Sequence, residues 1–487
     1  MSAPATRPWR KLAAPLALVA GAGALRLISG VGFANYDTLY ALAWGGQLSR
    51  GETPAYDIAI APTPHPLLEA LGFVLSPLPA RAIERITVAV GFLALAGCGA
   101  LVYRLGADWF GRAAGFVAAA VLLTRVPILS YGVRAYVDLP FLALVLAALT
   151  VESRAQLRDG RPPGARVLAL LALAGLLRPE AWALSGIYWL YLAVWTHRRE
   201  PHALTVGRLG PPALLALSAP LLWMLSDLAI TGDPLWSLTN TRHTAHTLGR
   251  VTGIANAPEY IPRRIGEILR PAALVGAALG GVLALVCLRR RALIGAAAGA
   301  AAVAVFLAVA AAGLSINTRY AFLTAAILCV FCGAGAFGWV KLAPGDRRRR
   351  PWALAGAALV VGLLASAPGQ YHAADRELDN LGRQQDIQDD LVALVKKGAV
   401  NLRCGPVGVP SHAPIPLLSL YLSTTPRKIV DAQTEEILRG VYADPASREV
   451  EATYVIDPHD PHVPVGVPPG FRAVAANRSW LIFGRCA

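Results

Sequence analysis

The residues of this sequence best suited to chemistry are carboxylates and arginines at the ends of apolar stretches. Asp37 follows the first apolar run in the segment NYDTLY, and Asp138 opens a later run in GVRAYVDLPF. Arg178 and Glu180 share the short turn LLRPEAW, and Arg319 begins another run in NTRY. A carboxylate can take a proton from an attacking hydroxyl, and arginine is a permanently charged, bidentate ligand for phosphate. Together they predict a site that handles a phosphate-bearing molecule beside a general base.

A polar stretch at residues 34–66 surrounds Asp37 and is the expected floor of this site. It is rich in proline and aromatic residues, whereas the sequence on either side is apolar. Four of its side chains are candidate substrate contacts: Tyr40, Tyr56, Asp57 and His65. Three candidates lie elsewhere: Glu180 in the turn already named, and Trp236 and His243 in a later polar segment. Arg26, high in the first apolar run, is a further candidate for phosphate.

Composition decides the class of protein that must position these residues. Of 487 residues, 55% are hydrophobic and only 15% are charged, and the mean hydropathy is +0.50. A soluble chain of this length could not cover so much apolar surface, so the sequence predicts an integral membrane protein. The net charge of +15 is concentrated in short clusters between apolar runs, such as LRRRA and GDRRRRP. Such clusters are typical of membrane topology and do not indicate a nucleic-acid surface.

Eleven apolar runs are candidates for crossing a bilayer, which takes about 20 residues. They are Leu12–Phe33, Ile83–Tyr103, Ala113–Leu129, Leu139–Thr150, Val167–Leu177, Trp182–Trp195, Pro212–Ile230, Ala272–Leu288, Ala292–Leu314, Ala321–Val340 and Trp352–Ala367. With a cytoplasmic N-terminus, every strong basic cluster falls in a cytoplasmic loop, as the positive-inside rule requires. This topology places residues 34–81 and everything after Pro368 outside. The first run is too long for the core of a secretory signal.

The fifth and sixth runs are too short to cross and flank Arg178-Pro179-Glu180. We expect them to form a helical hairpin whose tip stops within the outer half of the bilayer. A charged turn at that depth requires protein or a water-filled cavity around it, so Arg178 and Glu180 are expected to face a cavity. A structural Arg–Glu pair that joins two helices is the alternative.

The chain changes character after about residue 369. A polar amphipathic helix is followed by short apolar runs between Pro, Gly and Asp, which predicts a small α/β domain. Cys404 and Cys486 stand near the two ends of this domain, where a disulfide would close it in an oxidising exterior. The other four cysteines lie in apolar runs as packing residues. We therefore predict a helical polytopic membrane domain over residues 1–368 and an extracytoplasmic α/β domain over 369–487.

The order of these motifs resembles the GT-C class of membrane glycosyltransferases, including mannosyl- and arabinosyltransferases. NYDTLY and PTPHPL look like the acidic first external loop of that class, and GVRAYVDLPFLALV is similar to its second acidic site. GLLRPEAWAL resembles its short-helix hairpin, and GDPLWSL and NTRY resemble two later landmarks. The resemblance covers nearly all of the membrane part in order and does not extend to the C-terminal domain.

The resemblance implies that a sugar passes, with inversion, from a polyprenyl-phosphate donor to the hydroxyl of a glycan or protein acceptor at the outer face. Asp37 would be the general base, and Asp138 would orient the acceptor or bind a divalent metal such as Mg or Mn. Arg178 and Arg319 would neutralise the departing lipid phosphate. Many relatives carry tandem acids where this chain has Asp37 followed by Thr38, which leaves the metal open. The Ala, Gly and Arg content is typical of a GC-rich bacterium, so we expect a bacterial plasma membrane and a cell-envelope product.

Each candidate also has a purely structural alternative. Asp37 and Asp138 could cap the helices that follow them, and His65 could pack between its two prolines. Arg26 and Arg319 could extend to the membrane interface, and the aromatic residues could belong to an interfacial belt.

Two other classes of protein also stay open. A lipid or solute transporter would use charges at membrane depth, but such proteins typically show repeated halves, which the sequence lacks by inspection. A binding or assembly protein would need only one or two anchoring helices, whereas this chain has eleven apolar runs.

Overall fold

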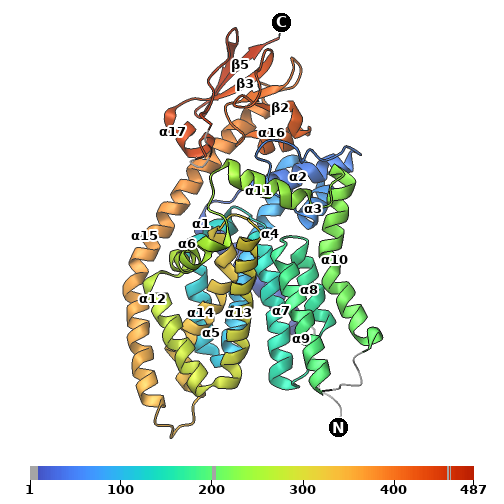
Figure 1. Cartoon of the computed structure of the whole chain (residues 1–487). Coiled ribbons are helices and arrows are strands. Elements are labelled where there is room, and N and C mark those ends of the chain that lie inside the picture. Colours follow the sequence, from blue (N-terminus) through green and yellow to red (C-terminus); the bar gives the residue numbers. More distant parts are fainter. Residues whose placement is uncertain (1–8, 200–204, 458–459, 461, 487) are drawn as a thin grey trace.

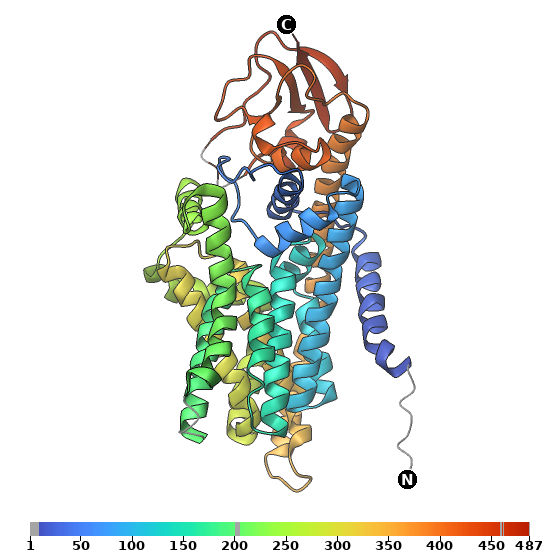
Figure 2. The ribbon, with the colours of Figure 1, turned by 90° about the vertical axis from the view of Figure 1, so that its right-hand side faces the viewer.

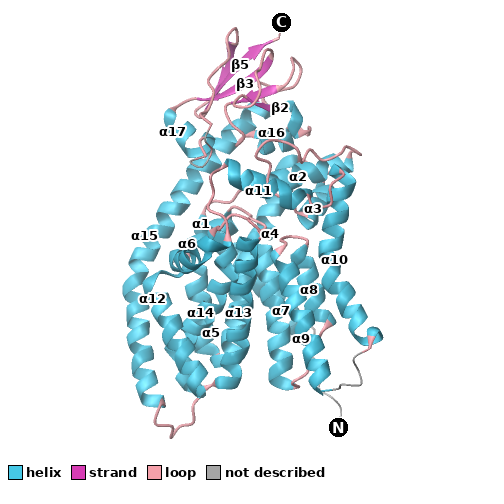
Figure 3. Ribbon diagram, viewed as in Figure 1, coloured by secondary structure: helices cyan, strands magenta, loops and turns pink. Residues whose placement is uncertain are grey.

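The computed structural model describes residues 9–199, 205–457, 460 and 462–486. Long helices form a bundle, and a small domain that contains a β-sheet lies at one end of it (Figure 1). A perpendicular view shows the same two parts, with helix α1 (Trp9–Ser29) at the edge of the bundle (Figure 2). Helices make up the bundle, and the sheet lies in the terminal domain (Figure 3). We call the end of the bundle that carries this domain the domain end.

Apart from a few end residues, such as 30–33 and 312–314, all eleven apolar runs lie in helices. Besides α1 these are α4 (Ala80–Phe110), α5 (Arg112–Leu123), α6 (Val126–Val133), α7 (Asp138–Arg158), α8 (Ala165–Gly175), α9 (Glu180–Arg199), α10 (Val206–Thr231), α12 (Ala257–Cys287), α13 (Arg289–Ala311), α14 (Phe322–Phe337) and α15 (Arg349–Lys396). Among the described residues, seven helices are long and apolar enough to cross a membrane, or eight if α5 and α6 form one bent span. The protein is therefore a multi-pass membrane protein.

One expected span, Ala113–Leu129, is broken rather than straight. It forms α5 and α6, whose axes differ by 66°. Arg125 is extended at the break, and Pro127 lies in the first turn of α6, where it cannot donate a backbone hydrogen bond to α5. The Arg125 guanidinium is buried and donates to the carbonyls of Val121 and Leu269 at 2.9 and 2.8 Å. The sequence-based prediction of a single helix was wrong there because it weighed hydropathy alone.

Close contacts between small residues hold the bundle together around α14. A Cβ atom at Gly280 of α12 would lie 1.9 Å from the carbonyl oxygen of Phe331. On another face of α14, a Cβ at Gly333 would lie 2.1 Å from the carbonyl oxygen of Ala114 in α5. Glycine therefore lets three helix backbones approach, which is how helices pack in membranes without a hydrophobic driving force.

Short helices at the domain end cover the bundle. They are α2 (Tyr36–Ser49), α3 (Pro66–Leu75), α11 (Trp236–Thr247), η2 (Ile254–Asn256) and η3 (Thr318–Ala321), whereas η4 (Gly338–Lys341) follows α14. Helices α2 and α3 touch at Gly45, where a Cβ would lie 2.3 Å from the carbonyl oxygen of Glu69. The polar stretch 34–66 is thus a compact layer.

The C-terminal domain is built on a mixed sheet of order β2-β1-β3-β5-β4. Its elements are β1 (Val407–Val409), α16 (Ile415–Tyr421), η5 (Pro426–Lys428), β2 (Ile429–Asp431), β3 (Gly440–Pro445), α17 (Arg448–Val450), η6 (Glu451–Val455), β4 (Arg472–Ala476) and β5 (Trp480–Arg485). Strand β1 is parallel to β2 and β3, and β5 is antiparallel to β3 and β4. The α/β character matches the expectation from the sequence.

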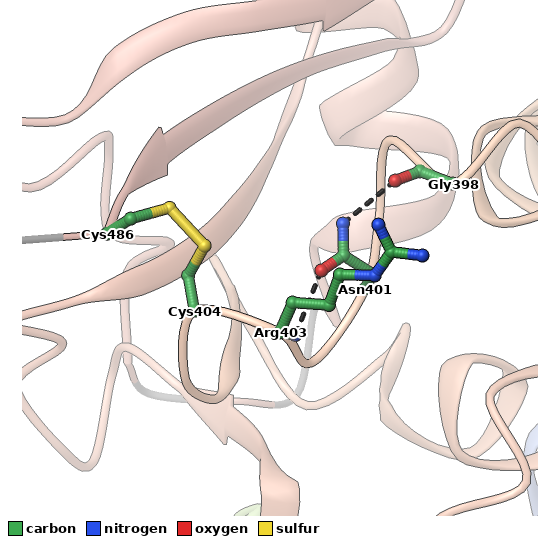
Figure 4. The surroundings of a disulfide bond; sticks show 5 residues. All are labelled: Gly398, Asn401, Arg403, Cys404 and Cys486. Atoms are coloured by element: carbon green, nitrogen blue, oxygen red, sulfur yellow. Dashed lines mark hydrogen bonds between the residues drawn. A yellow bond between two sulfur atoms is a disulfide. The ribbon is translucent and has the colours of Figure 1, made fainter.

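A disulfide joins Cys404 and Cys486, as the sequence predicts, with the two Cα atoms 4.8 Å apart (Figure 4). The turn before Cys404 is held by Asn401, which donates to the carbonyl of Gly398 at 2.8 Å and accepts from the Arg403 amide at 2.9 Å. Cys98, Cys329 and Cys332 are buried in the bundle as free thiols.

Helix α15 connects the two parts without interruption. The sequence suggested a membrane span and a separate polar helix, divided near residue 368, whereas the structure has one helix of 48 residues with Pro368 inside it. Apolar residues from α2 and from the C-terminal domain share one core. The domain is therefore packed on the layer that contains Asp37.

Candidate active site at the domain end of the bundle

Asp37 and Arg319 form an ion pair that is partly open to solvent. Asp37 lies in the first turn of α2, and its Oδ2 accepts from Nη1 of Arg319 in η3 at 3.2 Å. The two side chains are 19% and 18% exposed. Asn35 caps α2 by accepting from the Thr38 amide at 3.2 Å, so Asp37 is not the cap that the sequence left open. Its carboxylate is free to meet a ligand.

Arg178 forms a second, closed arrangement with two carboxylates. It lies in the turn between α8 and α9, where its Nη1 donates to Asp138 and its Nε and Nη2 donate to Oε1 of Glu180 at 2.8 and 2.5 Å. All three side chains are at least nine-tenths buried. Asp138 begins α7 without making a side-chain cap, so its interaction with Arg178 is what orients it. We call these three residues the buried triad.

Contacts with α3 fix the position of the hairpin tip. The Leu67 amide donates to the carbonyl of Leu176 at 3.1 Å, and Leu177 packs in a small apolar cluster with Ala41 and Leu68. The hairpin therefore ends against the layer of α2 and α3, in protein surroundings that can accommodate a charged turn.

Tyr320 and His65 link the open pair to the buried triad. The Tyr320 ring centre lies 4.9 Å from Cζ of Arg178 and 5.9 Å from Cζ of Arg319. His65 is buried at the start of α3 and interacts electrostatically with Asp37, Arg178 and Arg319. Burial lowers the pKa of His65 to about 4, against the opposing effect of Asp37, so the imidazole is neutral at pH 7.

Several buried polar atoms in this region have no hydrogen-bond partner within the described parts of the chain. They are Nδ1 of His65, Oδ2 of Asp138, Oε2 of Glu180 and Nε of Arg319. Buried polar groups in folded proteins are nearly always paired, so such a group of unpaired donors and acceptors indicates a place for a polar ligand or water. Because they include both donors and acceptors, hydroxyl groups and phosphate oxygens would each find partners.

Aromatic residues that the sequence did not single out line the same region. Tyr131 and Tyr136 stack with ring centres 4.3 Å apart, and Cζ of Arg134 lies 5.5 and 4.9 Å from those centres. Tyr136 interacts electrostatically with Asp37, Arg319 and Asp138. The motifs GVRAYVDL and NTRY contain Arg134, Tyr136 and Tyr320, but sequence alone gave no sign that their rings would converge.

Three predicted substrate residues of the polar stretch have other contacts. Tyr40 is fully buried between Tyr36 and Trp44, and Asp57 forms an exposed ion pair with Arg427 of the C-terminal domain at 2.7 Å. Tyr56 is buried and donates to Oε2 of Glu69 at 2.6 Å. The contacts of Asp57 and Tyr56 attach the polar stretch to the C-terminal domain and to α3, whereas Tyr40 packs within α2.

Glu69 is an acid that the sequence did not flag. It is buried in α3 and accepts from the His65 amide at 3.1 Å as well as from Tyr56. Burial raises the pKa of Glu69 to about 7.

The remaining candidates lie apart or at the margin. Trp236 begins α11 with its Nε1 buried and unpaired among the described residues. His243 lies on the exposed face of α11. Arg26 lines a separate cavity between α1, α4 and α15, and the structure does not bring it together with Arg178 and Arg319.

A divalent metal fits these residues poorly. Within the ranges that the structure describes, no group of three or more His, Cys, Asp or Glu residues is arranged to hold a metal ion. Asp37 and Asp138 each face an arginine instead of a second carboxylate.

Comparison with known proteins identifies the fold. No family model and no curated protein sequence matches the chain. The crystal structure of ArnT from Cupriavidus metallidurans bound to undecaprenyl phosphate superimposes with a TM-score of 0.58 and 13% identity, over 97% of this chain and 98% of that one. ArnT from the same organism in the apo state gives a TM-score of 0.55 at the same identity and coverage. The chain has the fold of ArnT, which confirms the GT-C fold expected from the sequence.

Proposed function

We propose that this protein is a glycosyltransferase that uses a polyprenyl-phosphate sugar and transfers the sugar to an acceptor hydroxyl. The main support is the open Asp37–Arg319 pair, which places a general base beside a phosphate ligand, among buried polar atoms that lack partners. The ArnT structure contains undecaprenyl phosphate, a lipid of the class proposed here. In this proposal the N-terminus is cytoplasmic and the site faces the exterior of a bacterial plasma membrane.

In the proposed reaction, the acceptor oxygen attacks C1 of the sugar from the side opposite the phosphate. The bond between C1 and the phosphate oxygen breaks, and its electron pair leaves with the polyprenyl phosphate. The proton of the acceptor hydroxyl passes to the Asp37 carboxylate. Arg319 stabilises the charge on the departing phosphate, which frees Asp37 from their ion pair. Attack from the opposite face inverts the configuration at C1.

The buried triad has a positioning role in this proposal. Arg178 already satisfies two carboxylates, so its charge reaches the phosphate through space and not as a free bidentate ligand. Oδ2 of Asp138 and Oε2 of Glu180 remain available to accept hydrogen bonds from sugar hydroxyls. Thr38, which follows Asp37, donates to the carbonyl of Ala135 at 2.9 Å and so serves structure.

The test is sugar transfer by purified protein from a panel of radiolabelled polyprenyl-phosphate sugars, with wild type beside Asp37→Asn. We expect Asp37→Asn to lower the transfer rate about a thousandfold while lipid binding and unfolding temperature stay unchanged. Glu52→Gln is the matched control, because Glu52 pairs with Arg50 in the exposed turn that follows α2. NMR of the product's anomeric configuration checks inversion.

Two results would contradict the proposal. Equal transfer by wild type and Asp37→Asn would exclude Asp37 as the base. Wild-type protein that moves the lipid between leaflets of a vesicle, but transfers no sugar to any acceptor, would favour the transporter alternative.

A further inference from the structure

A cavity of about 470 Å³ lies between α1, α4 and the part of α15 near the C-terminal domain, and neither the open pair nor the buried triad lines it. Apolar side chains such as Val19 and Phe92 line it together with polar ones. The polar lining consists of three arginines, two acids and two amides: Arg26, Arg81, Arg85, Glu84, Asp389, Gln385 and Gln388. A cavity lined by apolar side chains and by more arginines than acids suits a molecule with a hydrocarbon chain and an anionic head.

The positive charge in this cavity is only partly neutralised. Arg81 pairs with Asp389 at 2.6 Å and with Glu84 at 3.4 Å. Within the described residues, the guanidinium groups of Arg26 and Arg85 have neither an ion pair nor a hydrogen bond. Two arginines thus remain available for an anion, and arginine binds phosphate oxygens through paired N–H donors.

The cavity lining also contains a hydrogen-bond acceptor that lacks a donor. Gln388 is 5% exposed, and its Oε1 has no hydrogen-bond partner among the described residues. A phosphate oxygen cannot satisfy this atom, because both are acceptors. A ligand with a hydroxyl or N–H group near its phosphate would supply the missing donor.

The position of α1 opens the cavity toward lipid. Its outward side chains are strongly exposed, with Leu16 at 64%, Leu27 at 83% and Ile28 at 79%. Figure 2 shows α1 at the edge of the bundle, beside the long α4 helix. An acyl chain can lie along these apolar helices while its head group enters between them.

We propose that this cavity binds an anionic phospholipid whose head group carries hydroxyl groups, with phosphatidylglycerol as the simplest example. Arg26 and Arg85 bind the phosphate, and a head-group hydroxyl donates to Oε1 of Gln388. A phospholipid is favoured over the polyprenyl-phosphate substrate because neither Asp37 nor Arg319 lines the cavity. Gly32 and Phe33 line it, and the segment that they begin is held by the Gly32 amide, which donates to Gln385 at 2.9 Å, and by the Asn35 amide, which donates to the carbonyl of Arg134 at 3.0 Å. The bound lipid would brace the segment that leads into α2.

The experiment is native mass spectrometry of the full-length protein with added phosphatidylglycerol or phosphatidylcholine. Wild type is compared with the double variant Arg26→Gln/Arg85→Gln. Arg376→Gln is the matched control, because Arg376 is exposed on α15 and does not line the cavity. We expect one tightly bound phosphatidylglycerol in wild type and in the control, about tenfold weaker binding in the double variant, and weak binding of phosphatidylcholine to all three.

The unfolding temperature in lipid-free detergent shows whether the double Gln variant is still folded. A second control, Arg26→Lys/Arg85→Lys, keeps both charges and is expected to keep most of the phosphatidylglycerol binding. Phosphatidylglycerol binding that survives in the double Gln variant, or equal binding of the two phospholipids, would overturn the proposal. One-for-one displacement of phosphatidylglycerol by undecaprenyl phosphate would also overturn it, since the site would then belong to the prenyl lipid.

Discussion

The two acid–arginine arrangements at the domain end differ in how completely they are closed. In the buried triad, one guanidinium meets two carboxylates and all three side chains are nearly inaccessible. In the open pair, Arg319 makes one hydrogen bond of 3.2 Å to Asp37, and nearly a fifth of each side chain is exposed. Burial of a closed arrangement makes removal of one partner costly for folding, whereas an open pair can exchange its partner for a ligand. The buried triad therefore mainly stabilises the fold, whereas the open pair can take part in the reaction.

The largest effect on stability is expected from Arg178→Gln. This change leaves Asp138 and Glu180 buried without a cation, so we expect a loss of about 3 to 5 kcal/mol in the free energy of unfolding. Chemical denaturation in detergent measures it. The triple variant Arg178→Gln/Asp138→Asn/Glu180→Gln removes the stranded charges as well and should recover most of the loss. A triple variant as unstable as the single one would show that packing, and not charge, holds the hairpin tip.

Glu69 is a buried acid that, unlike Asp138 and Glu180, has no arginine partner. The folded pKa of about 7 lies above the ordinary value of 4.5, so the folded state holds a proton that the unfolded state has lost between these pH values. The unfolded state binds fewer protons there, so this group's contribution to stability is present below about pH 4.5 and is lost as the pH rises to 7. The total is about 3 kcal/mol. Between pH 5 and pH 7.5, the unfolding temperature should fall more for wild type than for Glu69→Gln. An equal fall in both proteins would contradict the raised pKa of Glu69.

Arg319→Gln should separate function from stability. Because Arg319 is only paired with a partly open carboxylate, we expect the unfolding free energy to change by less than about 1 kcal/mol. Loss of a charge-assisted contact that strengthens as the phosphate departs should lower kcat/KM for the donor about tenfold. Steady-state transfer assays measure this, and Arg319→Lys should restore part of the loss. If Arg319→Gln lost as much free energy of unfolding as Arg178→Gln, Arg319 would have a structural role like that of the triad.

The smallest effect is expected at the exposed pair of Asp57 and Arg427. Both side chains are more than half exposed, so Asp57→Asn should change the unfolding free energy by less than about 1 kcal/mol. The effect should disappear at high salt, where exposed charges are screened. A large, salt-independent loss of transfer in this variant would instead place Asp57 in the substrate site, as the sequence suggested.

The sequence went further for the fold than for the site. Hydropathy placed all eleven apolar segments in helices, although it missed the bend at Arg125 and the continuity of α15 across residue 368. It named Asp37, His65, Asp138, Arg178, Glu180 and Arg319, which the structure gathers in one region. It also named Arg26 and His243, which lie elsewhere, and it passed over Tyr320 and Glu69.

The sequence by itself determined the properties that depend on local composition: a membrane-spanning helical chain, a polar layer after the first helix, and a terminal domain with a disulfide. Helices form wherever apolar residues persist in a bilayer, because backbone groups must be paired there whatever the neighbouring helices do. Only the tertiary structure decided that Arg319 meets Asp37 across 282 positions, and that Arg178 meets Asp138 and Glu180. Such pairings depend on how helices approach one another at glycines such as Gly280 and Gly333, and that geometry is not encoded in any single segment.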